Sequence, residues 1–494
     1  MSSLISDPIS AKEPAMTAPR RAGASEDRPL VISGVLPRLA VKADHFPART
    51  ETGIGALMPW ANRLWFVTYV AHKAPSGGGT GLYWVDDDLR LHKHPQSRVG
   101  TFANRMVHKQ TEQLIIGPHV IDAHGHVRTI EGLLDIRVAA TMEHLTDPEH
   151  KIYCLGMEGE FVEVDLNSLE VTALFDLCTE LGIDPKRFKH FKDGYTAHGR
   201  VAVCNNTYEA ADHARGARQG DGRLAEWTPG DTSNGANAQG WRVIERCQFN
   251  GLAHRTSIGQ ALFAIGADPA SAILKTYLPS TGWVTYRLPK GTHTQDNTVT
   301  TEWPRIREVE SERWLLNASG MFYELPAMQY EDRVWGVQPI CRHLRIIGDY
   351  CAWNGMLVLA GDQTTPVWDK NIMVGQPQAN LWFGKTDDLW NFGKPKGWGG
   401  PWWKTSVNAG KPSDPYLMTG FEHKCLHVTA NSGGVANVHI ELDFTGCGDF
   451  HRYATLRLDG AGYAHHAFPS GLSAHWVRLV SDSDLVATAQ LHYT

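Results

Sequence analysis

A strand–turn–strand pattern that recurs along the chain constrains the fold more than any other feature of this sequence. Each copy has two short runs of alternating apolar and polar residues around a polar turn. The clearest copy is LYWVDDDLRLHKH (82–94), and others occur at residues 160–175, 222–247, 272–289, 381–395 and 454–469, with a shortened one at 320–328. Ahead of most copies lies a more continuous apolar run, such as RLWFVTYV, which indicates a strand covered on both faces.

Internal repeats of this kind predict an architecture built from many similar sheets. A covered inner strand followed by an outer hairpin, repeated about seven times at intervals of roughly 45–70 residues, is typical of the blades of a β-propeller. We therefore expect an all-β chain that forms a seven-bladed β-propeller over residues 31–494. Its last segment, 475–494, would complete a blade with the N-terminal strand PLVISG. A β-helix and a double sandwich are the alternatives, but strictly regular short rungs, which favour a β-helix, are missing.

The start of the chain differs in composition from the rest. Residues 1–30 are rich in Ala, Pro, Ser and charged residues, and we expect a short disordered tail there. This segment lacks the apolar core of a secretory signal, and no run in the chain is long enough to span a membrane, so we expect a cytoplasmic protein without a membrane partner. The net charge is −6 and no long basic run occurs, which excludes nucleic acid as an expected partner.

The eight cysteines and the one helix-like segment complete this outline. None of the cysteines forms a CxxC pair, and several lie inside apolar strands such as KIYCLGM, so we expect buried reduced thiols rather than disulfides. The only helical pattern covers residues 176–190.

Polar and aromatic residues recur at the starts of the predicted inner strands. In a propeller these positions ring one mouth of the axial channel. Arg105 and His108 lie at the first such position. The same place in later blades holds His144, then His190, Lys192, Tyr195 and His198, then Glu302, Trp303, Arg305 and Arg307, then Arg342 and His343, while Trp398, Trp402, Trp403, Asp414 and Tyr416 follow in a tryptophan-rich segment. Any one of them could be an ordinary surface or core residue, but their recurrence at one topological position indicates a site.

Several kinds of chemistry leave no mark on the sequence. No HExxH pair occurs, and the HGH at 124–126, which falls in an expected hairpin turn, is the only zinc alternative. A serine nucleophile elbow and a phosphate-binding loop are both missing. The carboxylates Glu143, Glu209, Glu302 and Asp414 could serve a glycosidase, but none is distinguished by its spacing. We expect no required cofactor, and keep a structural calcium ion in the axial channel as an alternative.

A set of His, Tyr and Arg side chains suits chemistry on uronic acids. Elimination beside a carboxylate requires removal of the proton at C5 of the sugar, which becomes easier when the carboxylate charge is neutralised. An arginine can hold the carboxylate through two parallel hydrogen bonds, while a histidine or tyrosine removes or supplies the proton. The sequence therefore predicts a polysaccharide lyase, or a glycosidase that acts beside a uronate.

Several long stretches resemble one known group of enzymes. These are GIGALMPWANRLWFVTY, ANRMVHKQTEQLIIGPHVID, HLTDPEHKIYCLGMEGEFVEVDL, GYTAHGRVAVCNN, YRLPKGTHT, TEWPRIRE and SDPYLMTG. They resemble the seven-bladed propellers of glycoside hydrolase family 145 and the related rhamnose–glucuronate lyases and ulvan lyases. The likeness runs from about residue 50 to the end of the chain. It implies a glycan site at the propeller mouth with His, Tyr and Arg as the working groups.

The resemblance carries over residue by residue. Arg105 and His108 match the segment Asn-Arg-Met-x-His, His144 matches His-Leu-x-Asp-Pro, Tyr195 matches Gly-Tyr-Thr, and Trp303 and Arg305 match Thr-Glu-Trp-Pro-Arg-Ile-Arg. Three positions depart from the group. His119 replaces a frequent tyrosine, Thr207 and Tyr208 replace Gly-Glu after two asparagines, and Ser319 replaces a histidine. These departures predict a different substrate, and since the group contains both hydrolases and lyases, the fold does not fix the reaction.

The expected function is cleavage of an acidic glycan that contains rhamnose and a uronate, by β-elimination or by hydrolysis of an L-rhamnosyl–glucuronate bond. The predicted catalytic residues are His108 and His144 as base or acid, Tyr195 as acid, Arg105 as a carboxylate clamp and His119 as a replacement catalytic group. The predicted binding residues are Arg305, Trp303, His190, Lys192, Asn205, Arg255, Asp414 and Tyr416. The partner would be an acidic oligo- or polysaccharide, and the oligomeric state stays open. The alternative is a non-catalytic propeller that binds glycan or protein.

Overall fold

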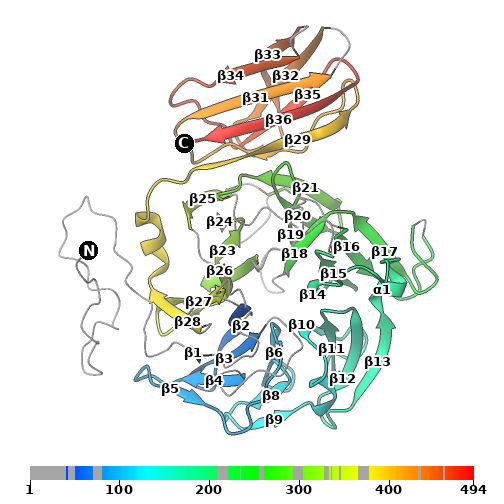
Figure 1. Ribbon diagram of the computed structural model, residues 1–494, viewed down its shortest axis with the longest axis vertical. Coiled ribbons are helices and arrows are strands. Elements are labelled where there is room, and N and C mark those ends of the chain that lie inside the picture. Colours follow the sequence, from blue (N-terminus) through cyan, green and yellow to red (C-terminus); the bar gives the residue numbers. More distant parts are fainter. Residues whose placement is uncertain are drawn as a thin grey trace, which may run out of the picture.

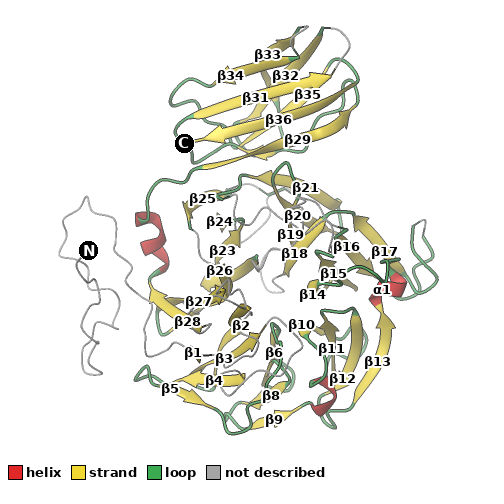
Figure 2. Cartoon of the chain, viewed as in Figure 1, coloured by secondary structure: helices red, strands yellow, loops and turns green. Residues whose placement is uncertain are grey.

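The chain folds into a ring of antiparallel sheets with a second, two-sheet unit beside it, as Figure 1 shows. The computed structural model describes residues 41–42, 51–70, 81–207, 221–233, 235–254, 261–292, 304–326, 333–334, 336–343, 346–364, 378–431, 435–459 and 462–494. Figure 2 shows that strands dominate and helices are few. No helix among these residues is long and apolar enough to cross a membrane. The all-β β-propeller predicted from the repeats is confirmed by this architecture.

Each blade of the ring is a four-stranded sheet whose first strand lies at the axis. The first three blades, from the axis outward, are β2(Glu51–Trp60), β3(Arg63–Val70), β4(Gly81–Val85) and β5(Leu91–Lys93); then β6(Arg105–His108), β7(Gln113–Ile116), β8(His119–Asp122) and β9(Val127–Thr129); then β10(Val138–Glu143), β11(Lys151–Gly156), β12(Glu160–Asp165) and β13(Val171–Asp176).

The next three blades follow the same order. They are β14(Phe191–Ala197), β15(Arg200–Asn205), β16(Arg223–Trp227) and β17(Trp241–Glu245); then β18(Gln248–Ala253), β19(Leu262–Ala267), β20(Ala272–Leu278) and β21(Gly282–Leu288); then β22(Arg305–Glu310), β23(Arg313–Ala318), β24(Met321–Leu325) and β25(Gln338–Arg342). The predicted hairpins at 82–94, 160–175, 222–247 and 272–289 are the outer pairs of four of these blades.

The last blade closes the ring with strands from both ends of the propeller. It contains β26(Ile346–Trp353), β27(Met356–Thr364) and β28(Gln378–Gly384), and its outermost strand is β1(Val41–Lys42), which pairs antiparallel with β28. Within the described residues this makes seven four-stranded units, and the innermost strands contact one another in the order β2, β6, β10, β14, β18, β22, β26 and back to β2. The N-terminal strand that completes a blade is Val41–Lys42, which pairs with β28, whereas the segment PLVISG proposed from the sequence lies outside the described residues.

Close backbone contact between neighbouring inner strands shapes the axis. A Cβ atom on Gly55 of β2 would lie 2.0 Å from the carbonyl oxygen of Phe102, and one on Gly348 of β26 would lie 2.1 Å from that of Ile54. Both glycines are the extra residue of a β-bulge, since the pairing register skips them. The bulges bend the inner strands and redirect the residues that follow them.

The C-terminal strands form a β-sandwich rather than a blade. One sheet has the order β29(Gly397–Val407), β36(Leu485–Tyr493), β31(Lys424–Asn431) and β34(Tyr463–Ala467). The other has β30(Tyr416–Leu417), β35(Trp476–Ser481), β32(Ala436–Asp443) and β33(His451–Leu458), and joins the propeller because β30 pairs with β21. The expectation of a single propeller over 31–494 is therefore wrong beyond β28, because alternating strands have the same period in a sandwich sheet as in a blade.

Two predicted hairpins illustrate this difference. Residues 381–395 contain β28 followed by the 3₁₀ helix η4(Thr386–Asn391), not a second strand. Residues 454–469 contain β33 and β34, which belong to opposite sheets of the sandwich. One continuous hydrophobic core runs from blades five and six into the sandwich, including Leu274, Tyr323, Trp476 and Leu491. The two units therefore share their buried interior.

The remaining small elements agree in part with the sequence. The predicted helical segment 176–190 holds only α1(Leu177–Glu180), whose N-cap residue Asp176 accepts a hydrogen bond from the backbone N–H of Cys178, and a further 3₁₀ helix is η3(Glu131–Leu133). All eight cysteines are free, six of them buried, Cys425 partly buried and Cys447 exposed. The prediction of reduced thiols is thus confirmed, apart from the exposure of Cys447.

Candidate functional site

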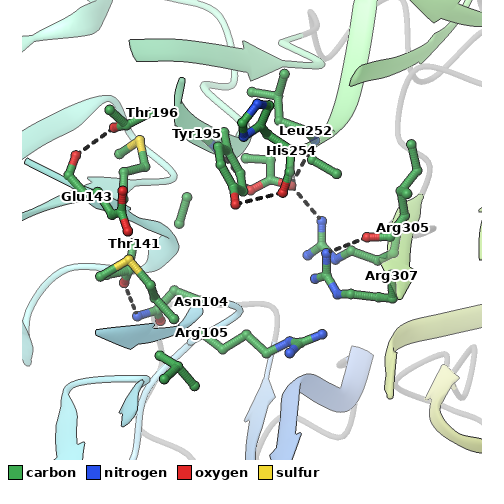
Figure 3. A pocket seen from close by; sticks show the side chains of 18 of the residues that line it. Asn104, Arg105, Thr141, Glu143, Tyr195, Thr196, Leu252, His254, Arg305 and Arg307 are labelled. Carbon is green, nitrogen blue, oxygen red and sulfur yellow. Dashed lines mark hydrogen bonds and ion pairs between the residues drawn. The ribbon is translucent and has the colours of Figure 1, made fainter. Parts of the chain in front are cut away.

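A cavity of about 280 Å³ lies where the inner strands converge at the axis of the ring (Figure 3). Its lining comes from six of these strands or their ends and includes Met58, Asn104, Arg105, Lys109, Thr141, Glu143, Asp193, Tyr195, His254, Arg305, Arg307 and Glu308. The cavity therefore depends on the ring as a whole, because no single blade supplies more than a small part of its wall.

Asp349 holds together the side of the axis where the ring closes. This side chain is fully buried, and its Oδ2 accepts a hydrogen bond from the backbone N–H of Leu57, at 3.0 Å, and forms an ion pair with Nε of Arg105, at 2.6 Å. Its Oδ1 accepts from Nε of Arg307 at 2.9 Å. One carboxylate on β26 thus contacts β2, β6 and β22, and each contact is charge-assisted on the acceptor side.

Asp193 makes an equivalent set of contacts on the opposite side of the ring. Its Oδ2 accepts from the backbone N–H of Leu252 at 2.9 Å and from Nη1 of Arg305 at 3.3 Å. In both sets the aspartate follows the extra residue of a β-bulge. The backbone N–H that it binds, of Leu252 or Leu57, belongs to the next inner strand of the ring, and the guanidinium, of Arg305 or Arg105, belongs to the inner strand after that. The same three-strand contact therefore occurs twice, from β14 across β18 to β22 and from β26 across β2 to β6.

The two aspartates differ in their proton affinity. Burial alone would raise the pKa of Asp349, but Arg105 and Arg307 outweigh it, and the pKa is held below its ordinary value. Burial also raises the pKa of Asp193, and Arg305 offsets only part of this rise. Asp349 therefore remains ionised at lower pH than Asp193, and the contact that it organises is the more strongly charged of the two.

Arg307 is the guanidinium best placed to bind a ligand. Its Nε is bonded to Asp349 and its Nη1 donates to the carbonyl of Ile306, at 3.0 Å, while Nη2 has no partner among the described residues. The side chain lines the cavity and is 20% exposed. Figure 3 shows Arg305 and Arg307 side by side, with Arg105 approaching the same hollow from another strand. Guanidinium groups in such an arrangement suit a carboxylate.

Tyr195 and His254 form the opposite wall in Figure 3. The hydroxyl of Tyr195 donates a hydrogen bond to the backbone carbonyl of His254 at 2.9 Å, and the two rings lie 6.0 Å apart between centroids. Burial raises the pKa of Tyr195 to about 12, so this phenol stays protonated at neutral pH. It can donate a proton or a hydrogen bond but cannot act there as a base.

Three of the predicted site residues do meet at this cavity. Arg105, Tyr195 and Arg305 all line it, as expected from their positions at or near the starts of inner strands. Arg105 and Arg305 each form an ion pair with an aspartate, so both side chains contribute to the structure of the axis as well as to the cavity lining.

The two histidines predicted to be catalytic lie outside the cavity lining. His108 is fully buried, and its ring nitrogens contact the hydroxyl of Thr111, at 2.7 Å, and the carbonyl of Pro148, at 2.8 Å. His144 follows β10, and its Nε2 bonds to Glu163 at 2.7 Å while its Nδ1 accepts the backbone N–H of Asp147. Both nitrogens of each ring are thus used in contacts that link local segments, and neither ring faces the cavity.

His119 is also misplaced by the sequence argument. It begins β8, the third strand of its blade counted from the axis, and is fully buried. Burial, with a contribution from His94 and Arg98, lowers its pKa to about 3. This ring lies inside a blade and does not line the cavity, so the catalytic role expected for His119 stays a prediction that the cavity does not support.

The predicted binding residues are largely scattered. His190 lies in the loop before β14 with a pKa far below its ordinary value, chiefly because of burial, and Lys192 is buried beside it, but neither lines the cavity. Asn205 is buried, and its Oδ1 accepts a hydrogen bond from the backbone N–H of Arg223. Asp414 and Tyr416 lie in the sandwich, far along the chain from any inner strand. Trp303 and Arg255 fall outside the described residues.

Asp414 and Tyr416 instead support the contact between the two units. Asp414 accepts a hydrogen bond from Nε of Arg287 at 2.8 Å, and Tyr416 is fully buried on β30, next to Arg287 of β21. These are contacts between the propeller and the sandwich, away from the cavity lining, and the binding role of both residues stays a prediction.

Sequence reasoning missed the residues that organise the site. Asp193 and Asp349 are single acidic residues inside otherwise apolar strands, and His254 follows an inner strand rather than preceding one. A usable signal did exist: in KDGYTA and IGDYCA an aspartate and a tyrosine occur in inner strands of two blades.

Metal binding at the axis has little support. Among the described residues no group of three or more His, Cys, Asp or Glu side chains is arranged to hold a metal ion. Three guanidinium groups already face the two axial carboxylates, so the local charge does not favour a calcium ion.

Comparisons with known proteins extend no further than the fold. No protein-family model and no curated protein matches this chain. Among solved structures, the chain is similar to one described as the structure of U3-55K, at 9% identity and a TM-score of 0.40 over 67% of this chain and 95% of the other. It is also similar to the Cps50 (Swd1) beta-propeller domain of Myceliophteria thermophila, at 9% identity and a TM-score of 0.38 over 68% and 97%.

A structure described as a nidogen/laminin complex matches at 11% identity and a TM-score of 0.31, over 56% of this chain and 89% of the other. The resemblance to glycan-cleaving enzymes finds no support in these comparisons, and the β-propeller rests on the strand topology of the chain itself.

Proposed function

We propose that this protein is a binding propeller whose axial cavity accepts a carboxylate group of an acidic glycan. One observation carries the proposal: Arg307 projects into the cavity with Nε fixed by Asp349 and with Nη2 not engaged by any described residue. A guanidinium whose orientation is fixed in advance loses less entropy when a ligand binds. The hydroxyl of Tyr195 and the polar groups of Thr141 and Glu143 line the same cavity and suit a hydroxylated ligand.

Binding without catalysis is favoured by the state of the histidines. A general base must reach the proton that it removes, either directly or through one water molecule. His108 and His144 do not line the cavity, and both are engaged in hydrogen bonds to other segments. With His108 and His144 outside its lining, the cavity keeps its arginines but does not contain the predicted acid–base pair.

Glycan cleavage remains the second candidate, because Tyr195 and His254 lie together on the cavity wall. A protonated tyrosine could supply the leaving-group proton, and a histidine could remove the proton beside the carboxylate. This candidate replaces the predicted pair His108 and His144 with a different pair and makes Arg307 the group that neutralises the uronate.

Calorimetric titration with a matched pair of ligands tests the proposal. An L-rhamnosyl–glucuronate disaccharide and its methyl ester differ only in the charge of the uronate. We expect the acid to bind at least tenfold more tightly than the ester. Arg307→Ala should remove this difference, since a hydrogen bond to a charged group contributes about 1.5–3 kcal/mol. Arg307→Lys should restore only part of it, because a lysine keeps the charge without the fork.

Arg313→Ala serves as the matched control. Arg313 lies on the neighbouring strand β23, pairs with Glu310 and Asp387, and does not line the cavity. Equal affinity for the acid and the ester, or an equal loss in both variants, would refute the binding proposal. The same samples are assayed for ultraviolet absorption by an unsaturated product and for released rhamnose. Turnover that disappears in both Tyr195→Phe and His254→Ala would establish the second candidate instead.

A further inference from the structure

The β-sandwich has two outer sheet faces of different character. On the sheet β30–β35–β32–β33 the outward side chains include charged groups, with Arg478 bonded to Glu441 at 2.8 Å and with Arg452 and Arg457 exposed. Such a surface is ordinary for a strand face in contact with water. The face of β29–β36–β31–β34 differs from it in composition.

The inner side of that second sheet is apolar and fully buried, with Leu426, Val428, Ala489 and Leu491 in the core. The alternate positions therefore face outward. According to the strand pairing they form rows across the sheet, which are Trp398, His492 and Cys425; Gln490, His427 and His465; and Thr488, Thr429 and Tyr463. We call this surface the histidine face. Its rows contain no Asp, Glu, Lys or Arg.

Rings dominate the centre of the histidine face. His427 lies 6.2 Å from Tyr463 and 6.3 Å from His465 between ring centroids, with interplanar angles of 22° and 28°. Tyr463 and His465 are 6.0 Å apart at 25°, and His492 lies 5.3 Å from His427 on the other side. The hydroxyl of Tyr463 bonds to Nδ1 of His427 at 3.0 Å, which fixes two of these rings against each other. Tyr463 is nonetheless 46% exposed.

Depletion of charged residues together with an excess of rings is the composition of binding surfaces rather than of solvated ones. The hydroxyl and amide groups of Thr429, Thr488 and Gln490 add hydrogen-bonding capacity between the rings. A hydroxyl-rich ligand with flat apolar faces fits this arrangement better than an apolar helix does, because nearly every row contains polar atoms.

The charge of the ligand follows from the titratable groups. The titratable groups at the outward positions of the four strands are His427, His465, His492, Tyr463 and Cys425, with Lys404 exposed on β29. Lys424, His466 and Tyr493 occupy the alternate, inward positions of the same strands. At the border, Lys290 of the propeller lies 5.4 Å from the centroid of the Trp398 ring, and Asp268 is bonded to Arg287 at 2.8 Å. No carboxylate in these rows opposes an anion, so the face is complementary to a negatively charged ligand.

We infer that the histidine face is a second binding site, separate from the axial cavity, for an extended acidic polysaccharide. The choice of an acidic glycan rests on the proposed function of the cavity, whereas the location and the charge preference rest on the sandwich alone. A polymer bound there would lie on the outer face of a sandwich sheet whose inner face packs into the same hydrophobic core as blades five and six.

Affinity electrophoresis of the whole protein through gels that contain gum arabic, or carboxyl-reduced gum arabic, tests this inference. We expect retardation by the acidic polymer and little retardation by the reduced polymer. Tyr463→Ala and His427→Ala should each weaken the interaction at least threefold. His439→Ala is the matched control, because His439 lies on the opposite sheet and contacts Thr455 at 2.9 Å.

Each outcome decides one of the two proposals. No retardation of the wild-type protein, or an equal loss in His439→Ala, overturns the second site, and so does full retardation of both Tyr463→Ala and His427→Ala. Thermal unfolding of the variants shows whether a loss of binding reflects a loss of folding. In the Arg307→Ala background disaccharide discrimination should be lost, while the polymer interaction that remains should still weaken with Tyr463→Ala and His427→Ala, so a failure of the cavity proposal is recognised separately.

Discussion

Replacement of Asp349 by alanine is the sharpest test of how the axis is built. The substitution removes the acceptor of the Leu57 N–H and leaves Arg105 and Arg307 without their shared carboxylate. Asp349 is fully buried. Breaking a buried ion pair by removal of one partner costs about 3–5 kcal/mol. The free energy of unfolding of Asp349→Ala should fall by about this amount.

The expected change can be read from the melting temperature. Unfolding entropy is about 2.1 cal/mol/K per residue, and the propeller from β2 to η4 covers roughly 340 residues. A loss of 3–5 kcal/mol then lowers Tm by about 4–7 °C, which differential scanning fluorimetry resolves. Glu441→Ala removes a partly exposed partner of Arg478 and should lower Tm by less than about 1 °C. A change in Asp349→Ala as small as that in Glu441→Ala would refute the idea that Asp349 organises the axis.

Three further outcomes follow from the structure. His108→Ala should leave the affinity for the disaccharide unchanged. It should lower the free energy of unfolding, measured with urea, by about 2–3 kcal/mol, because the carbonyl of Pro148 loses its buried hydrogen-bond donor. A loss of affinity with unchanged stability would contradict this. The pKa of His119 is lowered from 6.5 to about 3, so its contribution to the free energy of unfolding is complete above pH 6.5 and declines as the pH falls toward 3. Between pH 7.5 and 4.5 the free energy of unfolding of the wild-type protein should therefore fall by about 2–3 kcal/mol more than that of His119→Leu. Urea midpoints of the two proteins that change in parallel with pH would contradict this. Of the eight thiols, that of Cys447 should react first with a disulfide reagent, and Cys447→Ser should lack this fast phase, while rapid reaction of several thiols would show that the blades open readily.

The sequence predicted the blades because their outer hairpins and covered inner strands leave different patterns. It also placed Arg105, Tyr195 and Arg305 near the axis, since residues at the starts of inner strands converge there. His108 was assigned to the same mouth, although it is three residues after Arg105 on one strand. Side chains at odd spacing on a strand point to opposite faces, and the His108 ring contacts Thr111 and Pro148 rather than the cavity.

Other features had no local signature. Asp193 and Asp349 are held by guanidinium groups that lie between 42 and 244 residues away from them in the chain. The sandwich escaped prediction because β31, β32 and β36 alternate with the same period as the strands of a blade. Which strands pair is decided by tertiary contacts, such as the core shared with blades five and six.

The antiparallel pairing of Val41–Lys42 with β28 has a consequence for synthesis on the ribosome. The chain emerges from its N-terminus, so more than three hundred residues separate the appearance of β1 from that of its partner at Gln378–Gly384. During this interval β1 has no partner, whereas the six intervening sheets, each built from consecutive strands, can form as they are made. Completion of the circle is therefore a late, single event in the life of the nascent chain, and a ribosome stalled before β28 would hold an open arc.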